Sequence, residues 1–230
     1  YLGSAIANSS TSLPAQVNVD SKIGSEMLVN STIIGNQIDP KIASVRDGSA
    51  AFIWSAPKVG MDIAHRQLSS SGTFSSSEIR SNTFLAGDQT QPNIAVGVGG
   101  LAWTVWNSLG QDGDAGGIYK QGWTAAGAKK GGEVRVNVAG TGDQIRPSVS
   151  NYAGGHVVVW TLDSLNRSSV WMRRFRADGA PTGPEFRVDR RSAGFATEAA
   201  STSLSDGGVA VAWVERASAS MPGSVYARSY

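Results

Sequence analysis

Residues 156–179, HVVVWTLDSLNRSSVWMRRFRADG, contain two runs of β-branched and aromatic residues, and each run has the length of a β-strand. The first run contains Trp160, and similar apolar runs contain Trp54, Trp106 and Trp213. The intervals between these four tryptophans are 52, 54 and 53 residues. A period this regular, filled with strand and turn signals, is typical of a repeat architecture and above all of a β-propeller.

Each copy of the repeat contains four segments of strand length. The first segment is GNQIDPKIA (35–43), GDQTQPNIA (87–95), GDQIRPSVS (142–150) and a diverged GFATEAAST (194–202). The second is AAFIWSA, LAWTVWNS, HVVVWTL and VAVAWVE, and the third is DIAHRQLSSSG, GIYKQGWTAAG, SVWMRRFRADG and SVYARSY. The fourth is SEIRSN (77–82), GEVRVN (132–137) and PEFRVD (184–189), with SEMLVN (25–30) as its remaining match.

Turn residues separate these segments. Asp47-Gly48, Gly99-Gly100, Gly154-Gly155 and Gly207-Gly208 lie between the first and second segments, where a tight hairpin needs residues that tolerate positive φ. The third segment also closes on glycine in the three complete copies. We therefore expect four consecutive antiparallel strands in each repeat, which is one propeller blade.

The order of the segments predicts how the ring closes. The last copy stops after its third segment, whereas a fourth segment stands alone at 25–30. We predict an all-β, four-bladed β-propeller whose N-terminal strand completes the last blade and leaves no open edge. The blades are expected at about 31–82, 83–137, 138–189, and 190–230 with 25–30. Residues 1–24 are expected to be an extension or a partial repeat, since Gln16–Val19 resembles a further third segment.

Composition argues against several classes of function. Only 17% of the residues are charged, the net charge is +2, and no run approaches the roughly 20 apolar residues of a membrane span. We expect neither membrane insertion nor nucleic-acid binding, since the arginines of 173–191 fit the exposed side of outer strands. Cysteine is absent, which favours a bacterial secreted or cell-surface protein.

The tryptophans form two groups with different expected roles. The four periodic ones share one strand position among Val, Ile and Ala, which favours packing between neighbouring blades. The other three are less regular and are the candidates for exposed platforms against sugar rings: Trp103, Trp123 and Trp171.

A second set of candidate ligand-binding residues follows the glycine that opens the first segment. Innermost strands of a propeller surround a central channel, so polar residues that enter them converge at one mouth. The alternative is turn chemistry, in which these side chains bond nearby backbone groups. The residues are Asn36, Gln37, Asp88, Gln89, Asp143 and Gln144.

Metal and catalytic signals are sparse. Asp112 and Asp114, one residue apart in a glycine-rich loop, are the one place where we expect calcium, with an ordinary exposed turn as the alternative. No other cofactor is expected. The two histidines lack a nucleophile motif nearby, and Glu26, Glu78, Glu133 and Glu185 recur at the start of outer strands, so we predict no catalytic residue.

The four segments together resemble the tandem repeats of large secreted or surface proteins of bacteria, and the similarity covers residues 24–230. It implies a propeller or propeller-like array, whereas hemopexin-type propellers are similar only in blade number. We predict a non-catalytic extracellular binding or adhesion module for a glycan or a protein, within a larger repeat protein. The alternatives are a carbohydrate-active enzyme and a structural spacer.

Overall fold

The computed structural model describes residues 26–45, 47–58, 60–190 and 194–230, so the strand predicted at Gln16–Val19 lies outside the described part. These ranges form fifteen β-strands and one turn of 3-10 helix at Val98–Gly100. The predicted all-β class is confirmed. No helix in these ranges is long and apolar enough to cross a membrane.

The strands follow one another as four units, which we call blades 1 to 4. Blade 1 contains β1 (Ile38–Ser44), β2 (Ala50–Pro57), β3 (Met61–Leu68) and β4 (Ile79–Arg80). Blade 2 contains β5 (Gln89–Val96), β6 (Ala102–Leu109), β7 (Gly116–Trp123) and β8 (Lys129–Arg135). Blade 3 contains β9 (Asp143–Tyr152), β10 (Gly155–Ser164), β11 (Arg167–Arg176) and β12 (Phe186–Arg187). Blade 4 contains β13 (Phe195–Ser203), β14 (Val209–Arg216) and β15 (Ser224–Ser229).

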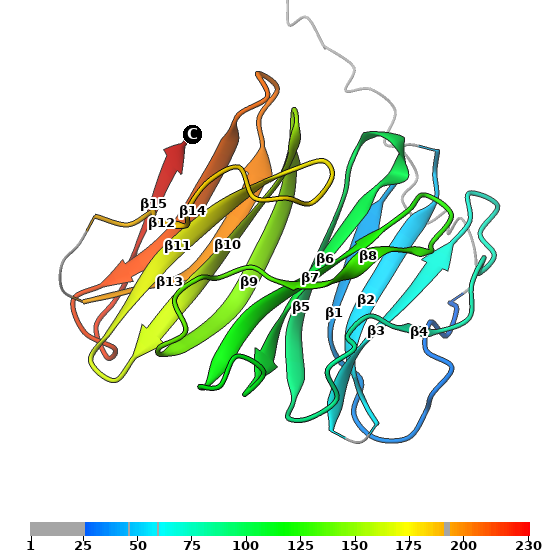
Figure 1. Cartoon of the computed structure of the whole chain (residues 1–230), viewed down its shortest axis with the longest axis horizontal. Coiled ribbons are helices and arrows are strands. Elements are labelled where there is room, and N and C mark those ends of the chain that lie inside the picture. Colours follow the sequence, from blue (N-terminus) through cyan, green and yellow to red (C-terminus); the bar gives the residue numbers. More distant parts are fainter. Residues whose placement is uncertain (1–25, 46, 59, 191–193) are drawn as a thin grey trace, which may run out of the picture.

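Within each blade the strands pair in sequence order as antiparallel neighbours, as the turn signals predict. Blades 1 and 2 are separate four-stranded sheets (Figure 1). Blades 3 and 4 are joined into a seven-stranded sheet by a single parallel pair between Ser168 and Phe195. The repeat therefore folds as four meanders placed side by side.

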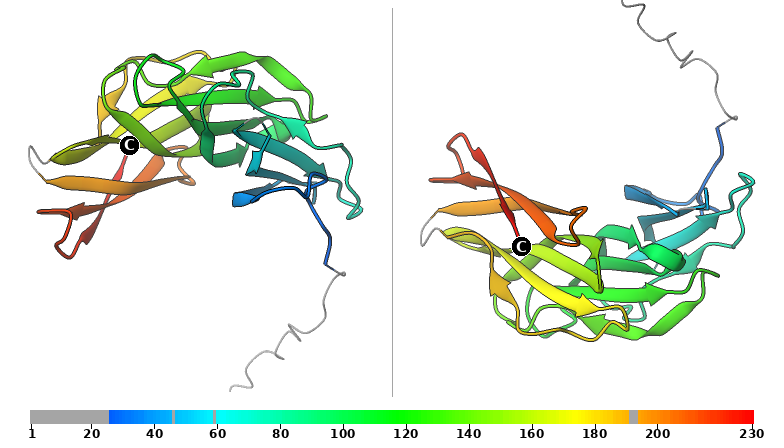
Figure 2. Two further views of the ribbon diagram at one scale, coloured as in Figure 1. Left: turned by 90° about the horizontal axis from the view of Figure 1, so that it is seen from below. Right: turned by 90° about the horizontal axis from the view of Figure 1, so that it is seen from above.

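The four blades form an open arc, and the predicted closure of the ring is not observed. Figure 2 shows the C-terminal strand β15 at one end of the arc and the N-terminal part of the chain at the other. In the described chain β15 pairs only with β14, and residues 26–30 form no strand with it. The reason is geometric, because blade 4 and residues 26–30 stand on opposite sides of the opening.

The apolar core lies between successive blades. One cluster joins blades 1 and 2, a second joins blades 2 and 3, and a third joins blades 3 and 4. The periodic tryptophans are all buried. Trp106, Trp160 and Trp213 each belong to the cluster shared with the preceding blade, and Trp54 packs within blade 1 and against Val29. The predicted packing role of these residues is confirmed, because an indole covers a large apolar area in the wedge between two twisted sheets.

Titratable groups are also buried between blades. The ring of His65 in blade 1 lies against that of Trp123 in blade 2, with centroids 4.2 Å apart and the planes tilted by 37°. His156 of blade 3 lies between Trp103 and Phe175, and its Nε2 is 3.0 Å from Lys120 Nζ. Burial, with a smaller effect from Arg173, lowers the pKa of Lys120 to about 7. Burial also lowers the pKa of both histidines, so at pH 7 these interfaces contain two neutral imidazoles and a lysine that is about half charged.

We predict that His65 makes the protein sensitive to mild acid. Among the described residues, neither ring nitrogen of His65 has a hydrogen-bond partner, and burial lowers its pKa from 6.5 to about 4. Below pH 6.5 the unfolded chain binds a proton that the folded protein does not bind, so stability is lost as the pH falls toward 4. The contribution of this residue is roughly 2–3 kcal/mol between pH 7 and 4.5.

The test is urea unfolding of the wild type and His65→Met at both pH values. Methionine is the matched replacement, because Met172 occupies the same strand position, fully buried, in blade 3. The loss of free energy of unfolding on acidification should be smaller in the variant by that amount. An equal loss in both proteins would show that His65 remains neutral in the unfolded state or is protonated in the folded one.

Candidate functional site

The innermost strand of every blade contains a bulge at the same place. Within the described ranges, the non-glycine residues with left-handed backbone are Asp39, Gln91, Arg146 and Glu198, with φ of 55°, 54°, 51° and 59°. Each is the fifth residue of the first segment, and strand pairing is interrupted at each of them. A bulge redirects a side chain at the expense of backbone strain, and such strain concentrates at functional sites.

These four bulged residues line one cavity of about 410 Å³ at the inner face of the arc. The cavity is also lined by Lys41. The backbone N–H of Arg146 donates to the side chain of Gln91 at 2.7 Å, which fixes two neighbouring bulges against each other. We call this group of residues the axial site.

The axial site contains opposite charges in contact. The guanidinium of Arg146 lies 3.9 Å from the carboxylate of Glu198, and that of Arg216 lies 3.4 Å from the same oxygen. Half of the side-chain surface of Glu198 is exposed, so the carboxylate is held by cations and still open to solvent. Asp39 contributes a second carboxylate from the other end of the arc. Two carboxylates with amide and cationic groups form a set that suits polar, hydroxyl-rich ligands.

None of the four bulged residues of the axial site was predicted as a site residue from the sequence. The signal for this site is present in the first segment, where the fifth residue differs in every copy but is always polar, although its neighbours are similar. The backbone conformation could not be foreseen, because three of the four residues precede proline, which disfavours helical backbone at the preceding residue.

The polar residues predicted at the channel mouth connect blades instead of converging. The amide of Gln89 donates to Ala86 and Gly87 carbonyls and accepts from Asn82, and Gln144 repeats this pattern with Asn137. Both glutamines are 0–1% exposed. The turn-chemistry alternative accounts for these contacts, while ligand binding by this set stays a prediction.

The remaining members of that set lie at the same turns. Asp88 accepts from the backbone N–H of Met61 and Asp143 from that of Gly116, so each aspartate is tied to the third strand of the preceding blade. Burial raises the pKa of Asp143. Gln37 accepts from the indole of Trp54, and Asn36 is exposed.

The three candidate platform tryptophans are less exposed than predicted. Trp123 is fully buried and donates to Thr104, and Trp103 is 5% exposed because it stacks on His156. Trp171 is half-buried beside the cluster of blades 2 and 3. The expected exposure is therefore wrong for Trp103 and Trp123, since inter-blade packing covers both rings. Sugar binding by the three rings stays a prediction.

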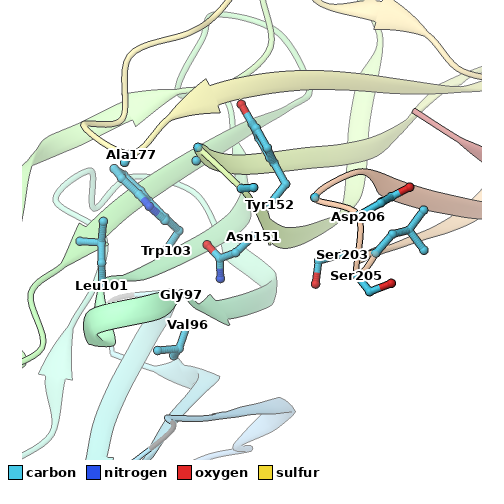
Figure 3. A pocket seen from close by; sticks show the side chains of 15 residues that line it. Val96, Gly97, Leu101, Trp103, Asn151, Tyr152, Ala177, Ser203, Ser205 and Asp206 are labelled. Carbon is cyan, nitrogen blue, oxygen red and sulfur yellow. The ribbon is translucent and has the colours of Figure 1, made fainter.

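A second cavity, of about 650 Å³, lies at the opposite ends of the innermost strands. Figure 3 shows Trp103 and Leu101 on one side of it and Tyr152, Asn151 and Asp206 on the other. Its lining comes from the hairpins of blades 2, 3 and 4. It contains one carboxylate from Asp206, whereas the axial site contains two, so the axial site is the stronger candidate for acid–base chemistry.

The predicted calcium loop makes contacts within blade 2 and with blade 3. Asp112 pairs with Arg135 at 2.7 Å, and Asp114 accepts from the backbone N–H of Gly142 in the next blade. Within the described residues there is no group of three or more His, Cys, Asp or Glu side chains placed to hold a metal. Calcium at this loop stays a prediction.

Solved structures with a similar fold are glycan-active enzymes. A thermostable family-43 glycoside hydrolase is 15% identical, with a TM-score of 0.52, over 84% of this chain and 71% of its own. The endo-arabinase of Bacteroides thetaiotaomicron VPI-5482 is 11% identical, with a TM-score of 0.54, over 87% and 78%. The GH93 α-L-arabinofuranosidase of Fusarium graminearum with arabinobiose is 11% identical, with a TM-score of 0.59, over 84% and 62%.

No family model and no curated protein sequence matches the chain. At these identities the structural similarity establishes the propeller fold, without confirming four blades as the full ring. The neighbours nevertheless contradict our prediction of a non-catalytic binding or adhesion module, because the three are named as glycosidases or glycoside hydrolases. The prediction that the protein is not an enzyme is corrected on the same finding, and the alternative of a carbohydrate-active enzyme is favoured.

We predict that the buried glutamines serve stability. Gln144→Ala leaves Asn137 and two backbone carbonyls without their buried partner, which should cost about 2–3 kcal/mol of unfolding free energy. Gln37→Ala is the matched control, because Gln37 is half-buried and makes fewer contacts, and it should cost less than about 1 kcal/mol. Chemical unfolding of both variants measures the difference, and equal costs would contradict this role.

Proposed function

We propose that this protein is a carbohydrate-active enzyme that cleaves glycosidic bonds at the axial site. The observation that carries the proposal is the repeated bulge, which brings Asp39, Gln91, Arg146 and Glu198 from four different blades to one cavity. The fold neighbours support it, because a family-43 glycoside hydrolase, an endo-arabinase and an α-L-arabinofuranosidase share the architecture.

Two carboxyl groups are the minimum set for hydrolysis of a glycosidic bond. One protonates the leaving oxygen, while the other activates a water molecule or attacks the anomeric carbon. Asp39 and Glu198 are the carboxylates of the axial site, and we assign this pair of roles to them. Arg146 is a positioning residue, because it pairs with Glu198 and is itself fixed through Gln91.

The substrate class that we propose is a pentose-containing plant polysaccharide, such as an arabinan. This follows from the neighbours, two of which are named for arabinan or arabinofuranoside cleavage. The open shape of the site, on the inner face of the arc, suits a polymer rather than an enclosed monosaccharide.

The setting of the enzyme is also a proposal. The repeats resemble those of large secreted or surface bacterial proteins, and a plant polysaccharide is too large to enter a bacterial cell intact. We therefore propose a secreted or cell-surface location within a larger repeat protein, with calcium at Asp112 and Asp114 as a structural ion.

We predict that the purified protein releases reducing sugar from arabinan or arabinoxylan. Asp39→Asn and Glu198→Gln keep the shape of each side chain but remove its acid–base function, so each should lower kcat by about 1,000-fold or more. A reducing-end assay with the two polymers and with xylan measures the rates.

Asp178→Asn is the matched control, because Asp178 is an exposed carboxylate paired with Arg176 outside the cavity. It should leave the rate unchanged. Turnover that survives both axial substitutions would place the chemistry elsewhere. The absence of turnover on every polymer, with the fold intact, would contradict the proposed function.

A further inference from the structure

The segment that precedes blade 1 makes the contacts of an outer strand. Arg173 of β11 donates to the carbonyl of Val136 at 2.8 Å, and Arg228 of β15 donates to that of Val188 at 2.8 Å. In both pairs the arginine is in the third strand of one blade and the valine follows the short outer strand of the blade before it. Arg66 of β3 makes the same bond to the carbonyl of Val29 at 2.7 Å.

A second recurring contact leads to the same placement. Glu185 of blade 3 accepts from the backbone N–H groups of Val138 and Ala139, just beyond the fourth segment of blade 2. Glu78 of blade 1 accepts from those of Ser31 and Thr32 in the same way. Residues 26–32 therefore occupy the place of the last strand of a blade that stands before blade 1.

The backward face of blade 1, which is the face turned away from blade 2, is left uncovered by the part of the chain that the structure describes. Ile94 and Val149 hold one position of the innermost strand in blades 2 and 3, and they are 7% and 5% exposed because the preceding blade covers them. Ile42 holds this position in blade 1 and is 62% exposed. Of the blade that should cover this face, the described chain supplies only the outer segment 26–32, from which Val29 packs beside Trp54.

The forward face of blade 4, which is the face turned away from blade 3, is likewise left uncovered by the described residues. Ile63, Ile118 and Val170 hold one position of the third strand, and each is 0% exposed. Val225 holds this position in β15 and is 76% exposed. Among the described strands, none pairs with the free edge of β15 in the way that β4, β8 and β12 pair in the other blades.

We propose that the arc is closed by one further four-stranded unit of the same repeat, which uses residues 26–30 as its outer strand. This unit would cover the forward face of blade 4 with its backward face and the backward face of blade 1 with its forward face. The occupant is defined by the existing interfaces, because both exposed faces carry the residue types that successive blades already bury against each other. A head-to-tail contact of this kind forms a ring when the rotation closes.

The proposal does not depend on the proposed function, and its test measures stability and exchange. The chain is extended at Tyr230 with a second copy of residues 176–230, which supplies the turn and the fourth segment for blade 4 and three segments of a new blade. Residues 26–30 then complete the new blade. We expect the amides of β15 to exchange about tenfold more slowly in the extended chain, because the strand is paired on both sides. An extension with the same residues in scrambled order is the control.

Two substitutions locate the new contacts. Ile42→Asp and Val225→Asp should change the Tm of the original chain by no more than about 2 °C, since both side chains are exposed there. In the extended chain each should lower the Tm by about 5 °C or more, because the carboxylate would be buried. Ile94→Asp is the matched control and should lower the Tm of both chains, since Ile94 is already buried.

Three outcomes would overturn the proposal. In the first, the Ile42→Asp and Val225→Asp variants have the same effect in both chains, which would show that the extension covers neither face. In the second, the original chain is a monomer that already protects β15 and loses stability with Ile42→Asp, which would show that the four blades close on themselves. In the third, light scattering finds the original chain as a dimer with both faces protected, which would show that a second copy is the occupant.

Discussion

A blade of this protein cannot bury its apolar residues alone, since a sheet of three or four strands has two faces and no interior. Each blade therefore relies on a neighbour for each face, and the core consists of wedges between blades. Trp106 and Ile118 illustrate the rule within one blade. Trp106 belongs to the wedge with blade 1 and Ile118 to the wedge with blade 3, and both are fully buried. The positions of the other elements follow from this need to bury both apolar faces of each blade.

Stacking also buries polar backbone, and the repeat supplies a partner for it at fixed positions. Asn82, Asn137 and Asp189 each accept from the backbone N–H of a third-strand residue in their own blade. The two asparagines also donate to a glutamine at the start of the next blade. Because an unpaired buried donor or acceptor costs about 1–3 kcal/mol, most polar residues of the repeat are committed to holding blades together. Their recurrence reflects this structural task.

The four bulged residues of the axial site are not buried between blades, so their side chains are available to contact a ligand. Gln89 and Gln144 are identical in type because they make the same buried bonds, whereas Asp39, Gln91, Arg146 and Glu198 differ because their side chains project into a cavity. Divergence at one place in an otherwise regular array produces an asymmetric site from symmetric elements. It also explains how an architecture shared at 11–15% identity can hold different sites.

The sequence by itself determined the repeat, the strand order within each blade and the burial of the periodic tryptophans, because these depend on local turn chemistry and on apolar periodicity. It could not reveal the left-handed bulges, which arise from strand pairing, or the cover over Trp103 and Trp123, which comes from another blade. Only the tertiary structure decided the curvature of the arc and hence the separation of β15 from residues 26–30. The physical reason is that curvature is set by how side chains fill each wedge, a property of two facing blades that no single repeat encodes.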